Sequence, residues 1–499
     1  MKNYSAVIPH RQAFACPGLR AAKPYAFLPA LRTSAAGGLC ALLLVSAGMV
    51  LAPAPARAAS SADDEIRLLR EQIELLSKKI DTLEKRQAMT DADEAAAART
   101  TPKVTAGPAG IVVASADKAF SLKLGALVQT DARVFLDDGA SNRDGFLLRR
   151  IRTPLTGTVS KIFSFNITPE YAGGSNTSSS ASLVDAWFSA TLTPAFGLKA
   201  GKFTLPVVLE PGGNRHFNEA PFINTLAPNR DIGIEAFGTL ASGFVDYRLG
   251  LFNGASNNNQ SFGGGSPGLD DGDFTTSGRL TVLPFKKSDG PLSKLALSLG
   301  GDFGNKRGTS AANGLTAIVS NGQQTILNWG SLLADGEHTH ISPGLEWYTG
   351  TPFSLVAEFL WERQDLTNGS TFTKTVTNTG WRVSAGYVLT GEPAAKAGVT
   401  PAKPFNWENG TWGAFEVVAR VSGFDMDDDL FTGAGSLSSS TNVTGAFAYG
   451  AGLNWYLNQN VRLLFSVEKT EYDGGGSAST LKGAQADELY LFTRLQLQF

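Results

Sequence analysis

Residues 447–467 read FAYGAGLNWYLNQNVRLLFSV, and the spacing of apolar residues in this stretch decides the fold. An apolar residue occupies every second position from Phe447 to Leu457, and a second alternating run follows the short turn Asn458–Asn460. Successive side chains of a β-strand point to opposite faces, so each run has one apolar face and one polar or small face. The stretch predicts two antiparallel strands joined by a tight turn.

The same alternation recurs almost throughout residues 118–499, for example in 353–361 and 381–389. Connections between the runs differ greatly in length, from the short 458–460 to the Gly/Asn/Ser-rich 253–277. Alternating strands with short turns at one end and long loops at the other are typical of membrane barrels. About 380 residues at roughly 20–24 per strand and connection correspond to about 16–18 strands.

We therefore expect an all-β fold, a transmembrane antiparallel β-barrel of about 16 strands. The rival interpretation is a row of soluble β-sandwich domains, which would repeat every ~100 residues. We find no such repeat in the sequence. The last strand supports the barrel, because its apolar residues share one face and it ends in Phe, as in bacterial outer-membrane barrels: Leu489, Leu491, Leu495, Leu497 and Phe499.

Composition excludes several classes of protein. The net charge of −2 argues against a nucleic-acid-binding protein, which is usually basic. The two cysteines, Cys16 and Cys40, both precede residue 58, so the rest of the chain has no thiol for a disulfide, a metal site or catalysis.

Residues 1–58 have the pattern of a cleaved signal peptide. A basic start precedes the apolar run 35–52, and Ala56-Arg57-Ala58 supplies small residues for cleavage. A single-pass anchor is the alternative, but the run is short and is followed by Pro53 and Pro55. Loss of its six basic residues leaves 37 basic against 45 acidic residues, a net charge of −8.

Residues 63–87 carry a short heptad repeat with Ile at each a position and Leu at each d position: Ile66, Leu69, Ile73, Leu76, Ile80 and Leu83. This pattern predicts a short N-terminal coiled-coil helix, or else a lone amphipathic helix. Residues 88–117 look like an Ala/Asp/Thr/Pro linker. The predicted division is a signal peptide at 1–58, a periplasmic coiled-coil segment and linker at 59–117, and the barrel at 118–499.

Several short motifs occur in the order and spacing of one known family. They are Leu148-Arg149-Arg150-Ile151-Arg152, Ala200-Gly201-Lys202-Phe203, Pro228-Asn229-Arg230-Asp231-Ile232-Gly233, Leu389-Thr390-Gly391-Glu392-Pro393, Leu453-Asn454-Trp455-Tyr456 and Arg494-Leu495-Gln496-Leu497-Gln498-Phe499. Through them, residues 118–499 resemble the phosphate-selective porin O/P family.

The resemblance implies a trimeric 16-stranded barrel with a pore that attracts anions and takes up phosphate or polyphosphate. Two family positions lack their usual basic residue. The early Gly-Arg-Leu-Gln pattern reads Gly125-Ala126-Leu127-Val128-Gln129, and the usual Glu-Arg pair reads Pro221-Phe222.

We predict the pore-lining and anion-binding residues from the parity of the strands and from the family motifs. They are Arg149, Arg150, Arg152, Lys202, Arg230, Arg248, Arg382 and Arg420. For any single arginine, a salt bridge that stiffens the wall is the stronger interpretation, and Glu416 is a possible partner of Arg420. Adjacent residues of a strand point to opposite faces, so Arg149 and Arg150 can both face the lumen only if they lie at the rim or on a β-bulge.

Enzymatic function is not indicated. His338 and His340 share a strand face, but no third ligand follows nearby, and no nucleophile motif accompanies His216. We expect no catalytic residue, no metal site and no cofactor.

The sequence therefore predicts a porin of a Gram-negative outer membrane, with its N-terminal segment in the periplasm. Expected partners are outer-membrane lipids and lipopolysaccharide, two further copies of the chain, and small anionic solutes such as phosphate. Two alternatives stay open. One is a channel for other small solutes such as sugars, and the other is a barrel that mainly tethers the envelope.

Overall fold

The computed structural model describes residues 62–136, 144–172, 181–210, 216–254, 273–310, 313–316, 318–320, 322–475 and 487–499. The predicted signal peptide lies outside the described residues. Two compact units divide the chain, Met1–Arg86 and Gln87–Phe499, and each is described by itself.

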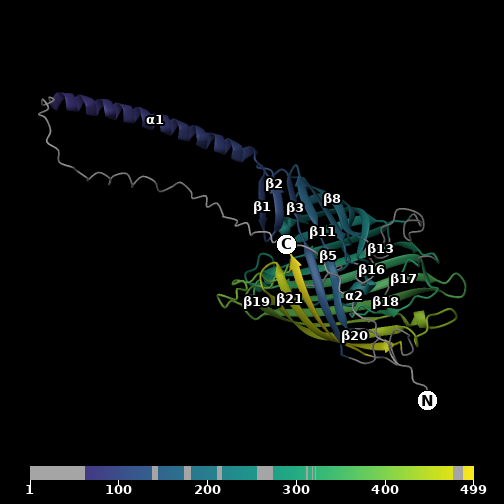
Figure 1. The fold of residues 1–499 in the computed structure, drawn as a ribbon. Coiled ribbons are helices and arrows are strands. Elements are labelled where there is room, and N and C mark those ends of the chain that lie inside the picture. Colours follow the sequence, from purple (N-terminus) through teal and green to yellow (C-terminus); the bar gives the residue numbers. More distant parts are fainter. Residues whose placement is uncertain are drawn as a thin grey trace, which may run out of the picture. The chain divides into compact units, whose positions relative to one another are not determined.

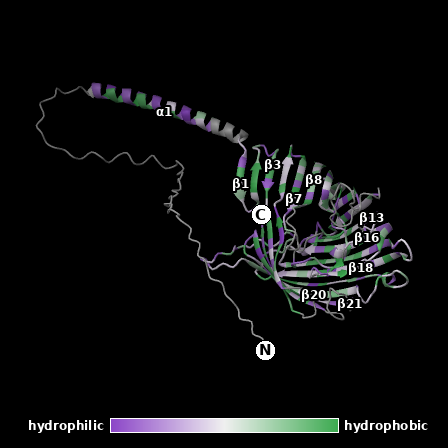
Figure 2. Ribbon diagram, turned by 45° about the vertical axis from the view of Figure 1, so that its right-hand side comes forward, coloured by the Kyte–Doolittle hydropathy of each residue, from purple (hydrophilic) through white to green (hydrophobic). Residues whose placement is uncertain are grey.

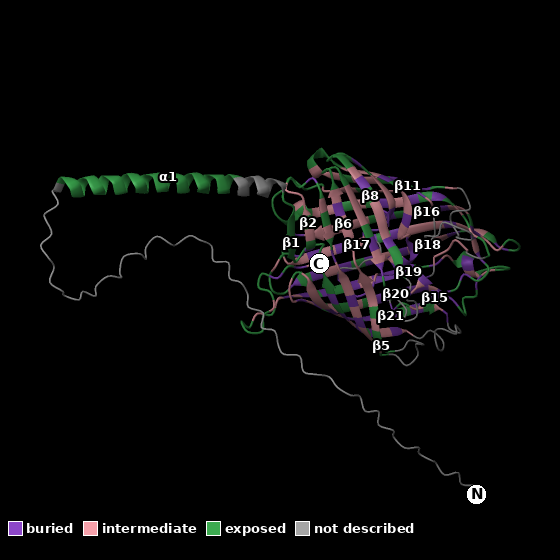
Figure 3. Cartoon of the chain, turned by 45° about the horizontal axis from the view of Figure 1, so that its top comes forward, coloured by how far each residue is buried: buried purple, intermediate pink, exposed green. Residues whose placement is uncertain are grey.

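A single long helix, α1 (Ala62–Thr100), contains the heptad repeat. The apolar side chains of the repeat are all exposed, from 47% for Ile66 to 65% for Ile73. Figure 3 shows α1 exposed along the part for which burial is drawn. The predicted helix is confirmed, whereas its association into a coiled coil stays a prediction. None of the described helices is long and apolar enough to cross a membrane.

Sixteen antiparallel strands close into a barrel, as predicted (Figure 1). Two of them are broken into halves, β3 (Ser121–Leu124) with β4 (Leu127–Phe135), and β5 (Gly145–Arg152) with β6 (Leu155–Val159). The next eight are β7 (Phe163–Glu170), β8 (Ser182–Thr193), β9 (Phe196–Thr204), β10 (Arg230–Leu240), β11 (Val245–Phe252), β12 (Thr275–Val282), β13 (Leu295–Arg307) and β16 (Leu333–Tyr348). The last six are β17 (Phe353–Thr367), β18 (Thr373–Val388), β19 (Ala414–Asp425), β20 (Val443–Tyr456), β21 (Val461–Gly474) and β22 (Glu488–Gln498).

The barrel closes where the last strand meets the first. β22 pairs with β4 from Leu127 to Phe135, and the backbones of Phe499 and Ala126 exchange two hydrogen bonds of 3.0 Å. We call this end of the barrel the Phe499 end. Through this closure each of the sixteen described barrel strands pairs with a neighbour on both sides, which a membrane-spanning sheet requires.

The segment predicted as a linker, 88–117, is largely ordered. α1 continues to Thr100, and a hairpin of β1 (Lys103–Gly107) and β2 (Gly110–Ala114) follows. β2 pairs with β3, so the hairpin extends the wall beyond Phe499. The expectation of a linker was wrong because the short β-branched run Ile111-Val112-Val113 gains a pairing strand that local composition does not reveal.

The outer face of the wall is apolar and the inner face is polar near the Phe499 end. Outward Val383, Tyr387 and Val417 are 39–50% exposed, whereas the inward Arg382 and Glu416 are buried. Figure 2 shows the resulting alternation of hydropathy along the strands. The parity predicted from the sequence is therefore confirmed.

Towards the opposite end, a hydrophobic core fills part of the interior. Wall residues on β17–β21, including Leu360, Val376 and Tyr472, pack against apolar residues of connections that enter the barrel. Among these connections are 205–229, with the short helix α2 (Ile223–Leu226), and 308–332, with β14 (Ile318–Val319) and β15 (Thr325–Leu327). Three short 3-10 helices lie in other connections: η1 (Ala241–Gly243), η2 (Pro291–Lys294) and η3 (Asp428–Phe431).

A charge on the outer face tests the lipid-facing assignment. Val421→Arg, in the middle of β19, is expected to lower the free energy of unfolding by about 2–4 kcal/mol, because the guanidinium enters hydrocarbon. Leu389→Arg, directly after the end of β18, is the control and should cost at most about 1 kcal/mol. Urea unfolding from lipid vesicles, followed by tryptophan fluorescence, measures both. Equal costs would contradict the assignment.

Candidate pore constriction

The connection between β9 and β10 enters the barrel and narrows it. In its described parts, 205–210 and 216–229, the side chains of Val207, Val208, Phe217, Phe222 and Ile223 are at most 1% exposed. The Leu205–Leu209 run is too apolar for an exposed loop, and burial against the inward face of the wall removes it from water. We call residues 205–229 the inward loop.

Arginines of the wall hold the backbone of the inward loop. Arg420 (β19) donates from Nη1 to the carbonyl of Glu219 at 2.7 Å, and Arg494 (β22) donates to the carbonyl of Asn218. Arg279 (β12), across the barrel, donates to the carbonyl of Val208. Buried carbonyls need donors, and these three come from widely separated strands, so the loop is fixed on more than one side.

The carboxylate of Glu219 lies at the centre of an arginine cluster. Its oxygens lie 2.8 Å from Arg149 Nε, 2.7 Å from Arg133 Nη2 and 2.9 Å from Arg494 Nη2. Burial alone would raise the pKa of Glu219, but these three guanidinium groups lower it well below the ordinary glutamate value. Glu219 therefore stays ionised and anchors the loop tip.

A β-bulge brings both adjacent arginines into the lumen, the geometry that the sequence required. Gln129 pairs with Arg150 and the next residue of β4, Thr130, pairs with Leu148, so Arg149 is the extra residue. Arg149 reaches Glu219, and Arg150 Nη1 donates to Gln129 Oε1 at 3.4 Å. Arg152, further along β5, bonds Glu170 at 2.6 Å.

The other predicted pore residues are spread around the wall and have acidic or carbonyl partners. Arg382 binds Glu210 of the inward loop at 2.6 Å and Glu358 at 3.1 Å. Arg420 binds Glu468 at 2.6 Å, and the predicted partner Glu416 instead accepts from Tyr456. The remaining pairs are Arg230 with Asp185 at 3.1 Å, Arg248 with Glu235 at 2.9 Å, and Lys202 Nζ with the Leu183 carbonyl at 2.9 Å.

Two arginines near the barrel seam are bridged by amides. Gln129 Nε2 donates to Gln496 Oε1 at 2.8 Å, and Arg462 Nη2 donates to the same oxygen at 3.1 Å. With Arg150 these residues form a row on β5, β4, β22 and β21, which we call the arginine–amide strip. Its glutamines were missed by sequence reasoning that sought charge alone, although strand parity places them on the inner face.

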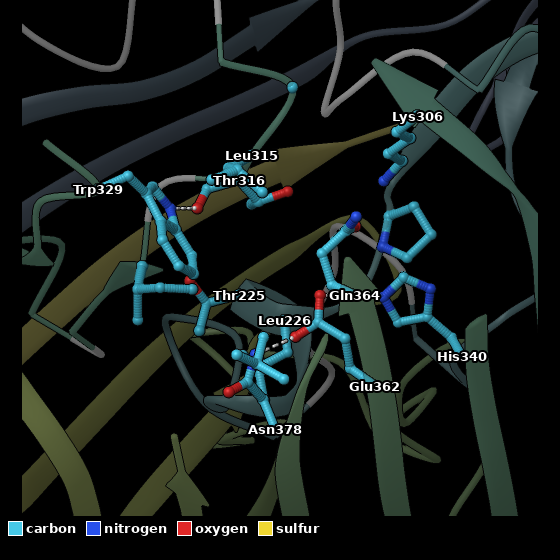
Figure 4. A pocket seen from close by; sticks show the side chains of 14 residues that line it. Thr225, Leu226, Lys306, Leu315, Thr316, Trp329, His340, Glu362, Gln364 and Asn378 are labelled. Atoms are coloured by element: carbon cyan, nitrogen blue, oxygen red, sulfur yellow. Dashed lines mark hydrogen bonds and ion pairs between the residues drawn. The ribbon is translucent and has the colours of Figure 1, made fainter. Parts of the chain in front are cut away.

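A second connection, 308–332, packs against the inward loop. Val319 N donates to Thr225 Oγ1 at 3.0 Å, and Ser320 Oγ donates to Glu488 Oε2 at 3.0 Å. A small cavity remains between the two connections and the wall. Figure 4 shows Trp329 and Thr316 on one side of it and Lys306, His340 and Gln364 on the other.

The histidines make no catalytic or metal site in the described part of the chain. His340 Nδ1 lies 2.6 Å from Asp302 Oδ1, and no group of three described His, Cys, Asp or Glu residues could hold a metal ion. His216 Nε2 lies 3.3 Å from Ser354 Oγ and 3.9 Å from Glu416 Oε1. A Ser–His–carboxylate triad needs the serine and the carboxylate on different ring nitrogens, so this arrangement is not a triad.

Comparisons with known proteins identify a family model, a relative and solved structures to which the chain is similar. Residues 122–499 match the family model described as phosphate-selective porin O and P. Porin O of Pseudomonas aeruginosa is 26% identical over 405 residues, which are 73% of this chain and 86% of that protein. Among solved structures, an anion-selective porin from Comamonas acidovorans aligns with a TM-score of 0.46 at 14% identity, over 76% of this chain and all of that one. The channel DcaP of Acinetobacter baumannii aligns with a TM-score of 0.46 at 12% identity, over 76% and 98% of the two chains.

Removal of the Glu219 charge tests the arginine cluster. Glu219→Gln leaves three guanidinium groups without their shared carboxylate, and loss of a buried charge partner costs about 3–5 kcal/mol. We expect a lower free energy of unfolding and a reversal potential, in a KCl gradient, shifted towards anion selectivity. Glu337→Gln is the control, since Glu337 is 38% exposed and pairs with Arg363. A shift towards cations would contradict the assignment.

Proposed function

The chain belongs to the phosphate-selective porin O and P family, and from that premise we propose that its barrel conducts small oxyanions, phosphate first among them. The family makes the chain an outer-membrane channel, in which solutes diffuse through a barrel, and not an enzyme. Which solutes pass depends on the charged side chains that this chain places in the lumen.

The arginine–amide strip carries the proposal. Arg150 donates to the amide oxygen of Gln129 and Arg462 to that of Gln496, and a neutral amide can orient a guanidinium group without itself adding a negative charge. Guanidinium stays protonated in any environment and binds oxyanions through paired N–H groups. Basic side chains along a pore favour anions. The strip is therefore the part of the wall best suited to attract and bind phosphate.

Acidic residues of the lumen oppose this attraction less than their number suggests. Glu358, Glu468 and Glu170 each lie within 3.1 Å of an arginine nitrogen. Two opposite charges at such a distance present little net field to a passing ion. The pairs hold the wall and the inward loop together, and the strip supplies the selectivity.

The strip is tested by Arg150→Gln with Arg462→Gln. Hydrogen bonds to charged groups contribute about 1.5–3 kcal/mol, so loss of either contact weakens phosphate binding about 10- to 100-fold and loss of both should weaken it further. Single-channel conductance with phosphate titration should show block at correspondingly higher phosphate, and the reversal potential should move towards zero. Arg307→Gln is the control, because that side chain is 70% exposed. A cation-selective wild-type channel, or one that phosphate does not block, would contradict the proposal.

We further propose that the chain is a homotrimer whose residues 1–58 are removed and whose α1 segment lies in the periplasm. An even number of strands places both ends of the barrel on one side. The stripe of exposed Ile and Leu at heptad spacing on α1 supports self-association. The apolar outer face of the barrel would contact membrane lipids. Lipopolysaccharide would lie on the membrane side opposite the periplasm.

The exposed stripe also favours a second function, an envelope tether. Deletion of residues 59–90 separates the two functions. If α1 only assembles the trimer, the protein that lacks residues 59–90 should run as a monomer in native electrophoresis. The outer membrane should then stay attached to the cell wall as in the wild type. If α1 tethers the envelope, the outer membrane should detach from the cell wall while phosphate uptake stays at the wild-type rate. The double change Ile73→Asp and Leu76→Asp is a milder variant for the same measurements.

A further inference from the structure

The longest connection at the Phe499 end, residues 389–413 between β18 and β19, lies on both sides of the wall. Other connections at this end are short, such as Pro194-Ala195 between β8 and β9. All residues of this connection are described, so both of its halves can be followed. We call it the rim loop.

The first half of the rim loop covers the inside of the barrel mouth. Ala394 and Val399 are buried against Tyr456 and Val388, which are inward residues of β20 and β18. The Ala394 N–H donates to the carbonyl of Thr351 at 2.9 Å. Next to these contacts, Lys396 Nζ lies 2.5 Å from Glu346 Oε1 of β16. This half therefore sets a lysine at the mouth of the pore.

The second half turns over the rim and lies on the outside. Phe405 N donates to the carbonyl of Leu457, in the turn after β20, at 2.6 Å. The Phe405 ring then meets that of Trp455, an outward residue, at 5.7 Å. Trp412 lies 6.3 Å from Trp455 and 6.1 Å from Trp407. We call Phe405, Trp407 and Trp412 the aromatic foot.

The aromatic foot is continuous with the lipid-facing wall. Trp455 stacks on Phe415 with ring centroids 5.7 Å apart, and the next outward residues, Leu453 and Val417, are exposed apolar side chains. Trp407 is 77% exposed and Trp412 is 51% exposed. Indole rings combine an apolar body with one N–H donor and concentrate where hydrocarbon meets headgroups. Their position at the strand ends fits that depth.

We propose that the aromatic foot binds the lipid headgroup boundary and that the bilayer thereby holds the rim loop in place at the pore mouth. Both halves belong to one stretch of 25 residues between β18 and β19. Seating of Trp407 and Trp412 in lipid restrains the backbone that carries Ala394, Lys396 and Val399. Lipid contact and the shape of the mouth are therefore coupled.

The lipid contact is tested with nitroxide labels on single cysteines, in a full-length chain carrying Cys16→Ser and Cys40→Ser. Trp407→Cys places a label in the foot, and Ala397→Cys places the control label in the inner half. In phosphatidylcholine vesicles, the label at 407 should be more accessible to oxygen than to a water-soluble nickel chelate, and the label at 397 the reverse. Greater nickel access at 407 overturns the proposal. Shielding from both reagents overturns it too and indicates a protein occupant.

The coupling is tested by Trp407→Ser with Trp412→Ser in single-channel recordings. The restraint on the mouth is lost, so we expect an increase in open-channel current noise and a shift in mean conductance. Tyr387→Ser is the matched control, since Tyr387 is a lipid-facing aromatic residue, 50% exposed, outside the rim loop. Heat-modified electrophoretic mobility confirms that each variant is folded. A folded double variant with wild-type conductance and noise overturns the coupling.

Discussion

A backbone segment inside a barrel must find donors for its carbonyl groups, since it has left bulk water. Here arginine side chains of the wall are these donors. Arg279, Arg420 and Arg494 donate to carbonyls of the inward loop from strands on different sides. Everything else in the interior depends on this contact, because the position of the loop determines where the lumen is filled and where a solute passes.

This arrangement changes the meaning of a positively charged lumen. Arg382 and Arg420 are among the most completely buried side chains, and their charge is used by carboxylates of the wall and by the inward loop. An arginine in a pore is therefore not by itself an anion site. The distinction lies in the partner: a carboxylate carries an opposite charge, whereas the side-chain amide of a glutamine is neutral.

Strand parity allowed most of the fold to be predicted from sequence. Alternation placed Phe447 and Trp455 outside and Arg420 inside, and adjacency of Arg149 and Arg150 required a bulge or a rim position. The partners could not be predicted, because Glu219 is 70 residues from Arg149 and Glu210 is 172 residues from Arg382. Phe222 illustrates the same limit. At a family position usually basic, it packs against Phe424 at 5.0 Å in the interior core.

The bulge on β5 has a consequence for how such a channel changes over evolutionary time. Arg149 is the extra residue of the bulge. Leu148 and Arg150 already pair with consecutive residues of β4, as they would in a regular sheet without Arg149. Deletion of this one codon would restore regular pairing and remove a guanidinium from the loop anchor without inverting the inside and outside of the remaining strand. A single insertion or deletion, which elsewhere in a barrel would exchange lipid-facing and water-facing residues, is here a small step. The anchor of the inward loop can thus change by one residue while the barrel itself stays closed.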